Sequence, residues 1–142
     1  NQMSLAMSPS ERQAFLADLH VGVISLPDPE SGPLTAPIWY DYRPDRGVWV
    51  LFSPDSRKGK LANVGTRISL VVQSENPPYK YVSVEGPITS IEKASDDELE
   101  AMAIRYLGDE TGKAYAAEGA GASVTASMSI ERWLTVDYAK SG

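Results

Sequence analysis

Cysteine is absent from this chain, and histidine occurs only once, at His20. The absence of cysteine excludes disulfide bonds, thiolate metal sites and thiol nucleophiles. A single histidine excludes multi-histidine metal sites, and no G-x-S-x-G motif is present to place a serine nucleophile beside it. His20 is expected in the last turn of the first helix, where an imidazolium favours the negative end of the helix dipole, so we interpret it as a helix-end residue.

Positive charge and long apolar runs are also scarce. The chain has 13 Lys and Arg against 19 Asp and Glu, which gives a formal net charge of −6. A nucleic-acid-binding domain needs a basic face, so nucleic acid is not an expected partner. No apolar run approaches the roughly 20 residues of a membrane span, so no membrane partner is expected. The first residues lack the charged and apolar regions of a signal peptide, and the expected location is cytoplasmic.

The alternation of apolar and turn residues is typical of a mainly β protein, a six- to seven-stranded antiparallel barrel with attached helices. At 142 residues the chain is expected to form one domain, 1–142, with residues 1–7 disordered or derived from an expression tag. We expect strands at 21–26, 34–42, 48–52, 67–73, 79–92 and 124–138. Capping boxes at 8–11 and 95–98 predict two helices, a shorter helix is expected at 109–119, and 120–123 is expected to be a mobile loop.

Three details sharpen this prediction. Pro37 is expected on an edge strand or at a bulge, because proline cannot donate to a strand ladder. Gly86 and Pro87 are expected to bend their long strand. Segment 48–52, VWVLF, is apolar on both faces, which is typical of a strand buried on both sides.

The segment SPDSRKGKLANVG, residues 53–65, concentrates positive charge in an acidic chain. Asp55 or Ser56 can cap a short helix there, and Gly65 can end it. Arg57 and Lys58 would then stand in the first turn, where like-signed charge is unfavourable unless an anion binds. The segment therefore indicates a phosphate site, with an ordinary solvated loop as the alternative.

Three parts of the chain carry a family resemblance: APIWYDY, the run from GVWVLF through SRKGKLANVG to RISLVVQ, and YKYVSVEGPI. Together they resemble the pyridoxamine 5′-phosphate oxidase-like superfamily of split β-barrels, closest to its flavin- or deazaflavin-dependent oxidoreductase branch. The resemblance covers most of the chain and implies a homodimer with cofactor sites at the subunit interface. In such proteins the Ser-Arg-Lys stretch holds the cofactor phosphate and the preceding strand end lies near the ring. The implied cofactor contacts are Pro37, Ile38, Trp39, Tyr40, Phe52, Ser53, Ser56, Arg57, Lys58 and, secondarily, Lys60, with Lys80 or Tyr81 reaching the ring from the partner subunit.

Two local considerations qualify these contacts. On a regular strand, side chains alternate, so at most one of Trp39 and Tyr40 faces the pocket. Gly59 stands where such proteins carry bulkier residues, which either loosens the helix or lets a long cofactor tail approach closely. Trp133 is expected in the core.

The implied function is hydride transfer from reduced deazaflavin coenzyme F420 to a conjugated organic acceptor. The alternatives are an FMN- or FAD-binding oxidoreductase and a protein that sequesters such a cofactor without turnover, while haem binding is disfavoured because the only histidine is His20. The acidic tail of F420 would need further cations, such as Lys60 or Arg67. The extra substrate-phosphate residues and C-terminal segment of the oxidase proper are missing, so pyridoxamine phosphate oxidation is not expected. No catalytic residue is assigned, and Tyr40, Tyr81 or a water remain equal candidates for proton donor.

Overall fold

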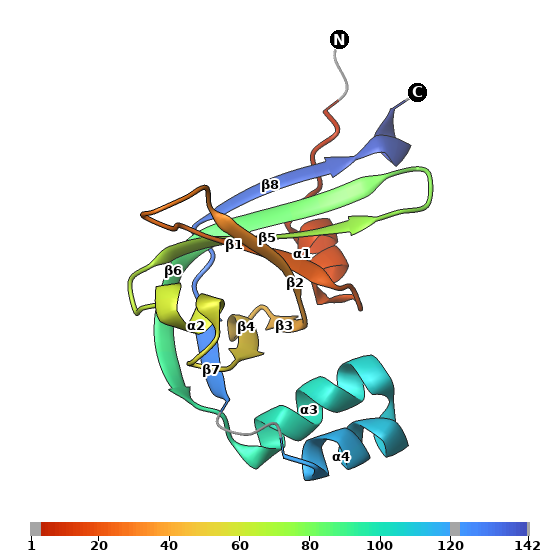
Figure 1. Cartoon of the computed structure of the whole chain (residues 1–142). Helices are drawn as coiled ribbons and strands as arrows, with labels where there is room; N and C mark the ends of the chain where they lie inside the picture. The colour runs from red at the N-terminus through yellow and green to blue at the C-terminus, as the bar shows by residue number, and fades with distance from the viewer. Residues whose placement is uncertain (1–3, 120–122, 142) are drawn as a thin grey trace.

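The computed structural model describes residues 4–119 and 123–141 (Figure 1). Most of these residues form a curled antiparallel sheet, with one helix pair at one end of it. The elements are α1 Pro9–Ala17, β1 Gly22–Leu26, β2 Leu34–Ile38, β3 Tyr40–Arg43, β4 Gly47–Phe52, α2 Arg57–Leu61, β5 Arg67–Ser74, β6 Lys80–Lys93, α3 Asp96–Leu107, α4 Asp109–Ala117, β7 Val124–Met128, β8 Arg132–Asp137 and the 3-10 turn η1 Tyr138–Lys140.

The strand order explains why the sheet closes on itself. Across the sheet the order is β2-β1-β5-β6-β7-β4-β3, with β8 paired to β6, and every pair is antiparallel. The strands β2 and β3 lie at opposite ends of this order, yet only Trp39 separates them in the chain. The sheet must therefore curl until its two edges meet at Trp39. This confirms the predicted split barrel, and it places Pro37 on an edge strand as expected.

Two segments predicted as single strands each form two, so the described residues contain eight strands rather than six or seven. Segment 34–42 is interrupted at Trp39, where the chain passes between the two edges of the barrel. Segment 124–138 is interrupted at 129–131, which lies opposite the predicted bend in β6. There the amides of Ser129 and Glu131 donate to the carbonyls of Pro87 and Glu85, and the ladder shifts register between Ile88 and Ser90. The irregularity of β6 thus coincides with the break between β7 and β8.

The barrel interior is filled by alternate side chains of the strands. The strand β4 has both faces covered, with Val48, Trp49 and Val50 all buried, as its apolar sequence predicted. The helix α1 begins at the Ser8 capping box and packs Leu16 against the barrel. The other main core side chains are Ile24, Leu26, Tyr40, Ile68, Leu70, Val72, Val82, Val84, Ile88, Ala126 and Met128.

The ends of the chain depart from one expectation. Residues 4–7 are described and ordered against the barrel, because Met7 is buried and the Asp137 amide donates to the Leu5 carbonyl at 2.8 Å. Residues 1–3 and most of the predicted mobile loop, 120–122, lie outside the described residues. In the part of the chain that the structure describes, no helix combines the length and apolar character that a membrane span requires.

Candidate functional site

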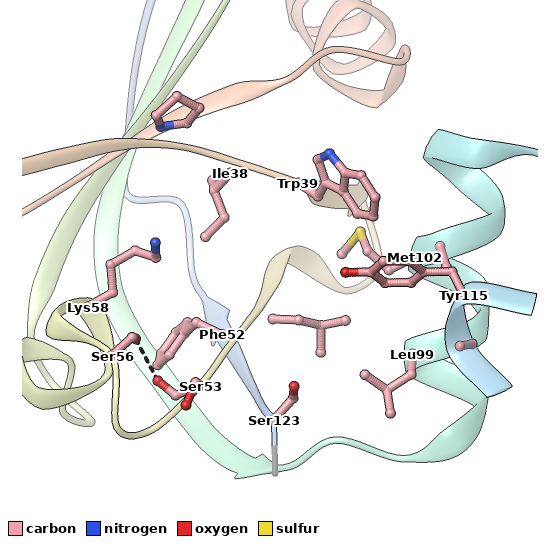
Figure 2. Close-up of a pocket in the computed structure, with 14 residues that line it drawn as sticks. Ile38, Trp39, Phe52, Ser53, Ser56, Lys58, Leu99, Met102, Tyr115 and Ser123 are labelled. Carbon is pink, nitrogen blue, oxygen red and sulfur yellow. Dashed lines mark hydrogen bonds between the residues drawn. The ribbon is translucent and has the colours of Figure 1, made fainter. Parts of the chain in front are cut away.

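A cavity of about 310 Å³ lies where the barrel edges meet, between α2, the ends of β2 and β4, and the α3–α4 pair (Figure 2). Its volume is at the lower end of the range for small-molecule sites. Its wall is mostly apolar and aromatic. The lining residues are Pro37, Ile38, Trp39, Leu51, Phe52, Ser53, Ser56, Lys58, Leu99, Met102, Ala103, Tyr115, Ala116 and Ser123.

Sequence reasoning found one side of this cavity. Seven of the twelve predicted site residues line it, because β2, β4 and the turn into α2 converge at the split of the barrel. The seven are Pro37, Ile38, Trp39, Phe52, Ser53, Ser56 and Lys58. The other five are Tyr40, Arg57, Lys60, Lys80 and Tyr81, and the structure places each of them elsewhere.

The turn into α2 is held by local hydrogen bonds. The Ser56 hydroxyl donates to the Ser53 carbonyl at 2.6 Å and accepts from the Gly59 amide at 3.1 Å, so it caps the helix as predicted (Figure 2). The helix is only five residues long and ends at Leu61 rather than at Gly65. A Cβ at Gly59 would lie 2.3 Å from the Ser53 carbonyl oxygen, so this glycine serves the packing of α2 on its own turn. That explains the glycine without the cofactor tail that the sequence suggested.

The three cations of the basic segment, Arg57, Lys58 and Lys60, lie in different surroundings in the structure. The Arg57 guanidinium is paired with the Asp28 carboxylate in the β1–β2 turn, away from the cavity. The Glu30 backbone amide, the Ser31 hydroxyl and Arg57 together lower the pKa of Asp28. Lys60 is exposed and outside the cavity wall. Of the described lining residues, only Lys58 carries a charge, so the predicted anion cluster reduces to one lysine.

Trp39 and Tyr40 divide as strand alternation requires. Trp39 lines the cavity, and its ring stacks on Tyr106 at 4.8 Å between centroids. The Tyr40 side chain instead points into the core, where its hydroxyl donates to the Leu16 carbonyl at 2.6 Å. Burial raises the pKa of Tyr40. Because its hydroxyl is already bonded to the Leu16 carbonyl, Tyr40 is a poor proton donor for a cavity ligand.

Lys80 and Tyr81 lie at the far end of β6 from the cavity. Lys80 faces the Asp137 carboxylate at 4.0 Å, and Tyr81 lies between its ladder partners Gln73 and Val136. Within one chain they cannot reach the cavity. Their predicted role needs a second chain and stays a prediction.

The opposite wall, which sequence reasoning missed, comes from α3 and α4 with the residues that flank them. Leu99, Met102 and Ala103 form an apolar stripe along α3. Tyr115 and Ala116 on α4 complete this wall. No local pattern shows that this stripe faces a ligand cavity rather than the core.

Two side chains of α3 dock this helix pair on the barrel. The Arg105 guanidinium donates to the carbonyls of Tyr40, Ala17 and Asp18 at 2.9, 3.2 and 3.0 Å. The Tyr106 hydroxyl donates to the His20 carbonyl at 2.6 Å, and burial raises the pKa of this phenol. These contacts link the helix pair to both β3 and the end of α1.

The site chemistry is that of a binding pocket for an apolar ring. None of the described lining residues is an aspartate, glutamate or histidine. Among the described residues there is also no group of three His, Cys, Asp or Glu that could hold a metal ion. The described lining residues therefore offer apolar and aromatic contact, hydroxyls from serine side chains and from Tyr115, and one cation.

The comparisons with known proteins establish the fold. The structure of the conserved hypothetical protein Rv2991 from Mycobacterium tuberculosis matches 99% of this chain and 91% of its own, with a TM-score of 0.78 and 19% identity. An F420 reductase matches 86% of this chain and 94% of its own, with a TM-score of 0.69 and 15% identity. An FAD- and haem-binding protein from Mycobacterium smegmatis matches 92% of this chain and 71% of its own, with a TM-score of 0.64 and 17% identity.

Other similar structures include the haem-storage protein HutZ from Vibrio cholerae, which matches 95% of this chain and 96% of its own with a TM-score of 0.66 and 14% identity. No family model and no curated protein matches the sequence. The chain thus has the split β-barrel fold that flavin-, deazaflavin- and haem-binding proteins share, as the sequence resemblance predicted.

Proposed function

We propose that this protein binds a deazaflavin or flavin ring in the cavity and serves as an oxidoreductase, with coenzyme F420 as the leading cofactor. The observation that carries the proposal is the cavity itself, an aromatic and apolar slot in which Lys58, at one end, is the single cation among the described lining residues. A planar ring compound that bears an anionic group matches this distribution. When bound, such a cofactor supplies the hydride chemistry, and the protein binds it, orients it and excludes water.

The dimensions and the charges limit how the cofactor can lie. About 310 Å³ suits one ring system, so the phosphate-bearing chain must extend past Lys58 toward the surface. The acidic tail of F420 would then meet Lys60, which is exposed on the same short helix. Arg67, the other cation considered, is already bound to Glu131 at 2.7 Å. Lys60 is therefore the residue expected to favour F420 over FMN.

We also propose that the protein is a homodimer whose partner completes the site. A row of outward-facing residues crosses four strands from Val23 through Val71 and Ser83 to Leu134. Val23 and Leu134 are 39% and 59% exposed, and Val23 pairs with Pro37 of the cavity wall. A second copy seated on this row would lie beside the cavity, where its Lys80 or Tyr81 can approach the ring. Leu134→Asp should convert the dimer to a monomer in sedimentation, and an unchanged dimer would place the interface elsewhere.

The cofactor proposal is tested by direct titration. F420, FMN, FAD and haem are titrated separately into the purified protein, and binding is followed by fluorescence quenching or, for haem, by absorbance. We expect F420 to bind most tightly. Tight binding of FMN alone, or of haem alone, contradicts the leading choice.

Three single substitutions separate the roles of the basic segment. Lys58→Ala should weaken F420 or FMN by about tenfold or more, because it removes a charge-assisted contact to the phosphate. Arg57→Ala should have a much smaller effect, because Asp28 holds this side chain away from the cavity. Lys60→Ala is the matched control for FMN and should weaken only F420. Riboflavin, which lacks the phosphate, should bind wild type and Lys58→Ala equally well. An equal loss for all three alanine variants would indicate general electrostatics instead of a defined contact.

Binding without turnover is the alternative function. The lack of acidic or histidine side chains among the described lining residues suits a sequestering protein as well as a hydride-transfer enzyme. Assays with the reduced cofactor and a panel of quinones and enones distinguish the two. Tight cofactor binding with no acceptor reduced would favour the sequestering protein.

A further inference from the structure

The cavity has two ends with different chemistry. Figure 2 shows Lys58, Ser56, Ser53 and Phe52 on one side, Ile38 nearer the middle, and the α3–α4 wall opposite. The proposed cofactor accounts for the lysine end and for the buried middle. The end that faces α3 and α4 has no assigned ligand.

We propose that this second end is an acceptor subsite, in which the Tyr115 hydroxyl donates a hydrogen bond to the carbonyl oxygen of an uncharged, planar, conjugated ligand such as a quinone. The inference rests on the proposed function, since it names the substrate class of the same site. Tyr115 is then the residue that selects the acceptor.

The Tyr115 hydroxyl is placed to meet a ligand. It lies on α4, and Figure 2 shows its hydroxyl pointing into the cavity. Among the described residues this hydroxyl has no hydrogen-bond partner, whereas the hydroxyls of Tyr40 and Tyr106 donate to the Leu16 and His20 carbonyls. Tyr115 is also 52% exposed, while Ile38 and Phe52 are 7% and 8% exposed. The aromatic end is therefore the part that a ligand from solution can reach once a ring fills the middle.

Trp39 gives this end a fixed aromatic surface. Its ring is nearly parallel to Tyr106, at an interplanar angle of 6°, and Tyr106 is itself held by its hydrogen bond to the barrel. The Tyr115 ring lies 6.0 Å from Trp39 and is tilted by 51°. Two aromatic rings at an angle, one of them immobilised by stacking, suit a planar ligand that packs on one and meets the edge of the other.

The charge distribution excludes an ionic acceptor at this end. Leu99, Met102, Ala103 and Ala116 are apolar, and the single charged group among the described lining residues, Lys58, stands at the opposite end. A carboxylate bound here would lose its hydration without gaining a cation. A neutral carbonyl needs only one donor, and the Tyr115 phenol provides it.

The test combines one substitution in the protein with the removal of one kind of group, the carbonyl, from the ligand. Tyr115→Phe removes the hydroxyl and keeps the ring. The probes are 2-methyl-1,4-naphthoquinone and 2-methylnaphthalene, which share their shape but differ in the two carbonyls. Both are titrated by calorimetry into the free protein and into protein saturated with the oxidised cofactor that binds it most tightly. The chain has no cysteine, so the quinone cannot form thioether adducts with it.

We expect Tyr115→Phe to weaken the naphthoquinone by about fivefold, the usual effect of one hydrogen bond, and to leave the naphthalene and the cofactor unchanged. Tyr138→Phe, which removes another partly exposed phenol outside the cavity, should change none of the three affinities. Equal losses for both probes, no loss for either, or an equal loss of cofactor affinity would overturn the proposal. If no cofactor binds the wild-type protein, the proposed function fails. If a cofactor binds and only the quinone affinity is insensitive to Tyr115→Phe, this inference alone fails.

Discussion

The two walls of the cavity are built in different ways. The α2 wall follows directly from β4 in the chain, and its turn is held by hydrogen bonds that span three residues, between Ser53, Ser56 and Gly59. The α3–α4 wall lies some forty residues further along and reaches the barrel through Arg105 and Tyr106, whose partners are more than sixty residues away. Local hydrogen bonds leave a pattern in the sequence, whereas long-range docking does not. The sequence therefore predicted the α2 wall of the site but not the α3–α4 wall.

Among the changes that test this difference between the two walls, the substitution of Arg105, which docks α3 on the barrel, should have the largest effect. Arg105 is only 18% exposed on its side chain, it bonds three backbone carbonyls, and it lies 3.4 Å from the Asp41 carboxylate. Arg105→Ala should lower the free energy of unfolding by about 3 kcal/mol, because it removes three charge-assisted hydrogen bonds to backbone carbonyls and the ion pair with Asp41. It should also weaken acceptor binding more than cofactor binding. Urea unfolding and the naphthoquinone titration measure the two effects.

A second arginine that pairs with α3 provides the control. Arg46 pairs with Glu98 of the same helix α3 at 2.8 Å, but its side chain is 32% exposed, against 18% for Arg105. Arg46→Ala should cost about 1 kcal/mol, as partly exposed ion pairs and a cation–π contact with Trp49 usually contribute. If Arg46→Ala destabilises as much as Arg105→Ala, surface pairing holds the helix pair and the docking argument is wrong.

How much the sequence revealed depends on the range of each interaction. The capping boxes and the apolar strand 48–52 depend on neighbours in the chain, and each was predicted. A bend was predicted at Gly86–Pro87, and the register shift of β6 lies next to it, between Ile88 and Ser90. The break at 129–131 on the partner side was not predicted, because it requires knowing which strands pair.

The basic segment, whose three cations lie within four residues of one another, shows the same limit of prediction from sequence. Its location beside the cavity was predicted from the strand-to-helix turn, but the sequence does not show that Asp28, in a distant turn, pairs with Arg57. Only Lys58 faces the cavity among the three cations considered. The count of charges in a motif thus overstates the charge that a ligand meets.

Each wall also contains a glycine that permits a close helix contact, and substituting them should produce the next largest effects. A Cβ at Gly112 would lie 2.6 Å from the backbone of Ile104 on α3, and one at Gly59 would lie 2.3 Å from the Ser53 carbonyl oxygen. Each change to alanine should cost about 2 kcal/mol, since backbone atoms must move apart. Gly112→Ala should weaken the quinone more than the cofactor, and Gly59→Ala should do the reverse.

The comparison of these two variants is checked by the same titrations and by urea unfolding. If both variants weaken both ligands in the same proportion, the two walls do not act independently and the cavity has no distinct ends. If Gly59→Ala leaves cofactor binding intact, the α2 turn does not position Lys58.

The smallest expected effect is a loss of stability in alkaline solution, and it reports on how the α3–α4 wall is anchored. Burial raises the pKa of Tyr40 and of Tyr106 above the ordinary value of 10.0, so the folded protein holds both phenolic protons more tightly than the unfolded chain does. The stability from these protons is complete below pH 10 and declines as the pH rises beyond it. The melting temperature should therefore fall between pH 9 and pH 11.

Tyr106→Phe should be less stable than wild type at pH 8, because the bond to the His20 carbonyl is lost, but should lose less stability on going to pH 11. An identical alkaline loss in wild type and variant would mean that Tyr106 opens to solvent before it ionises, and the helix pair would then be held mainly by Arg105.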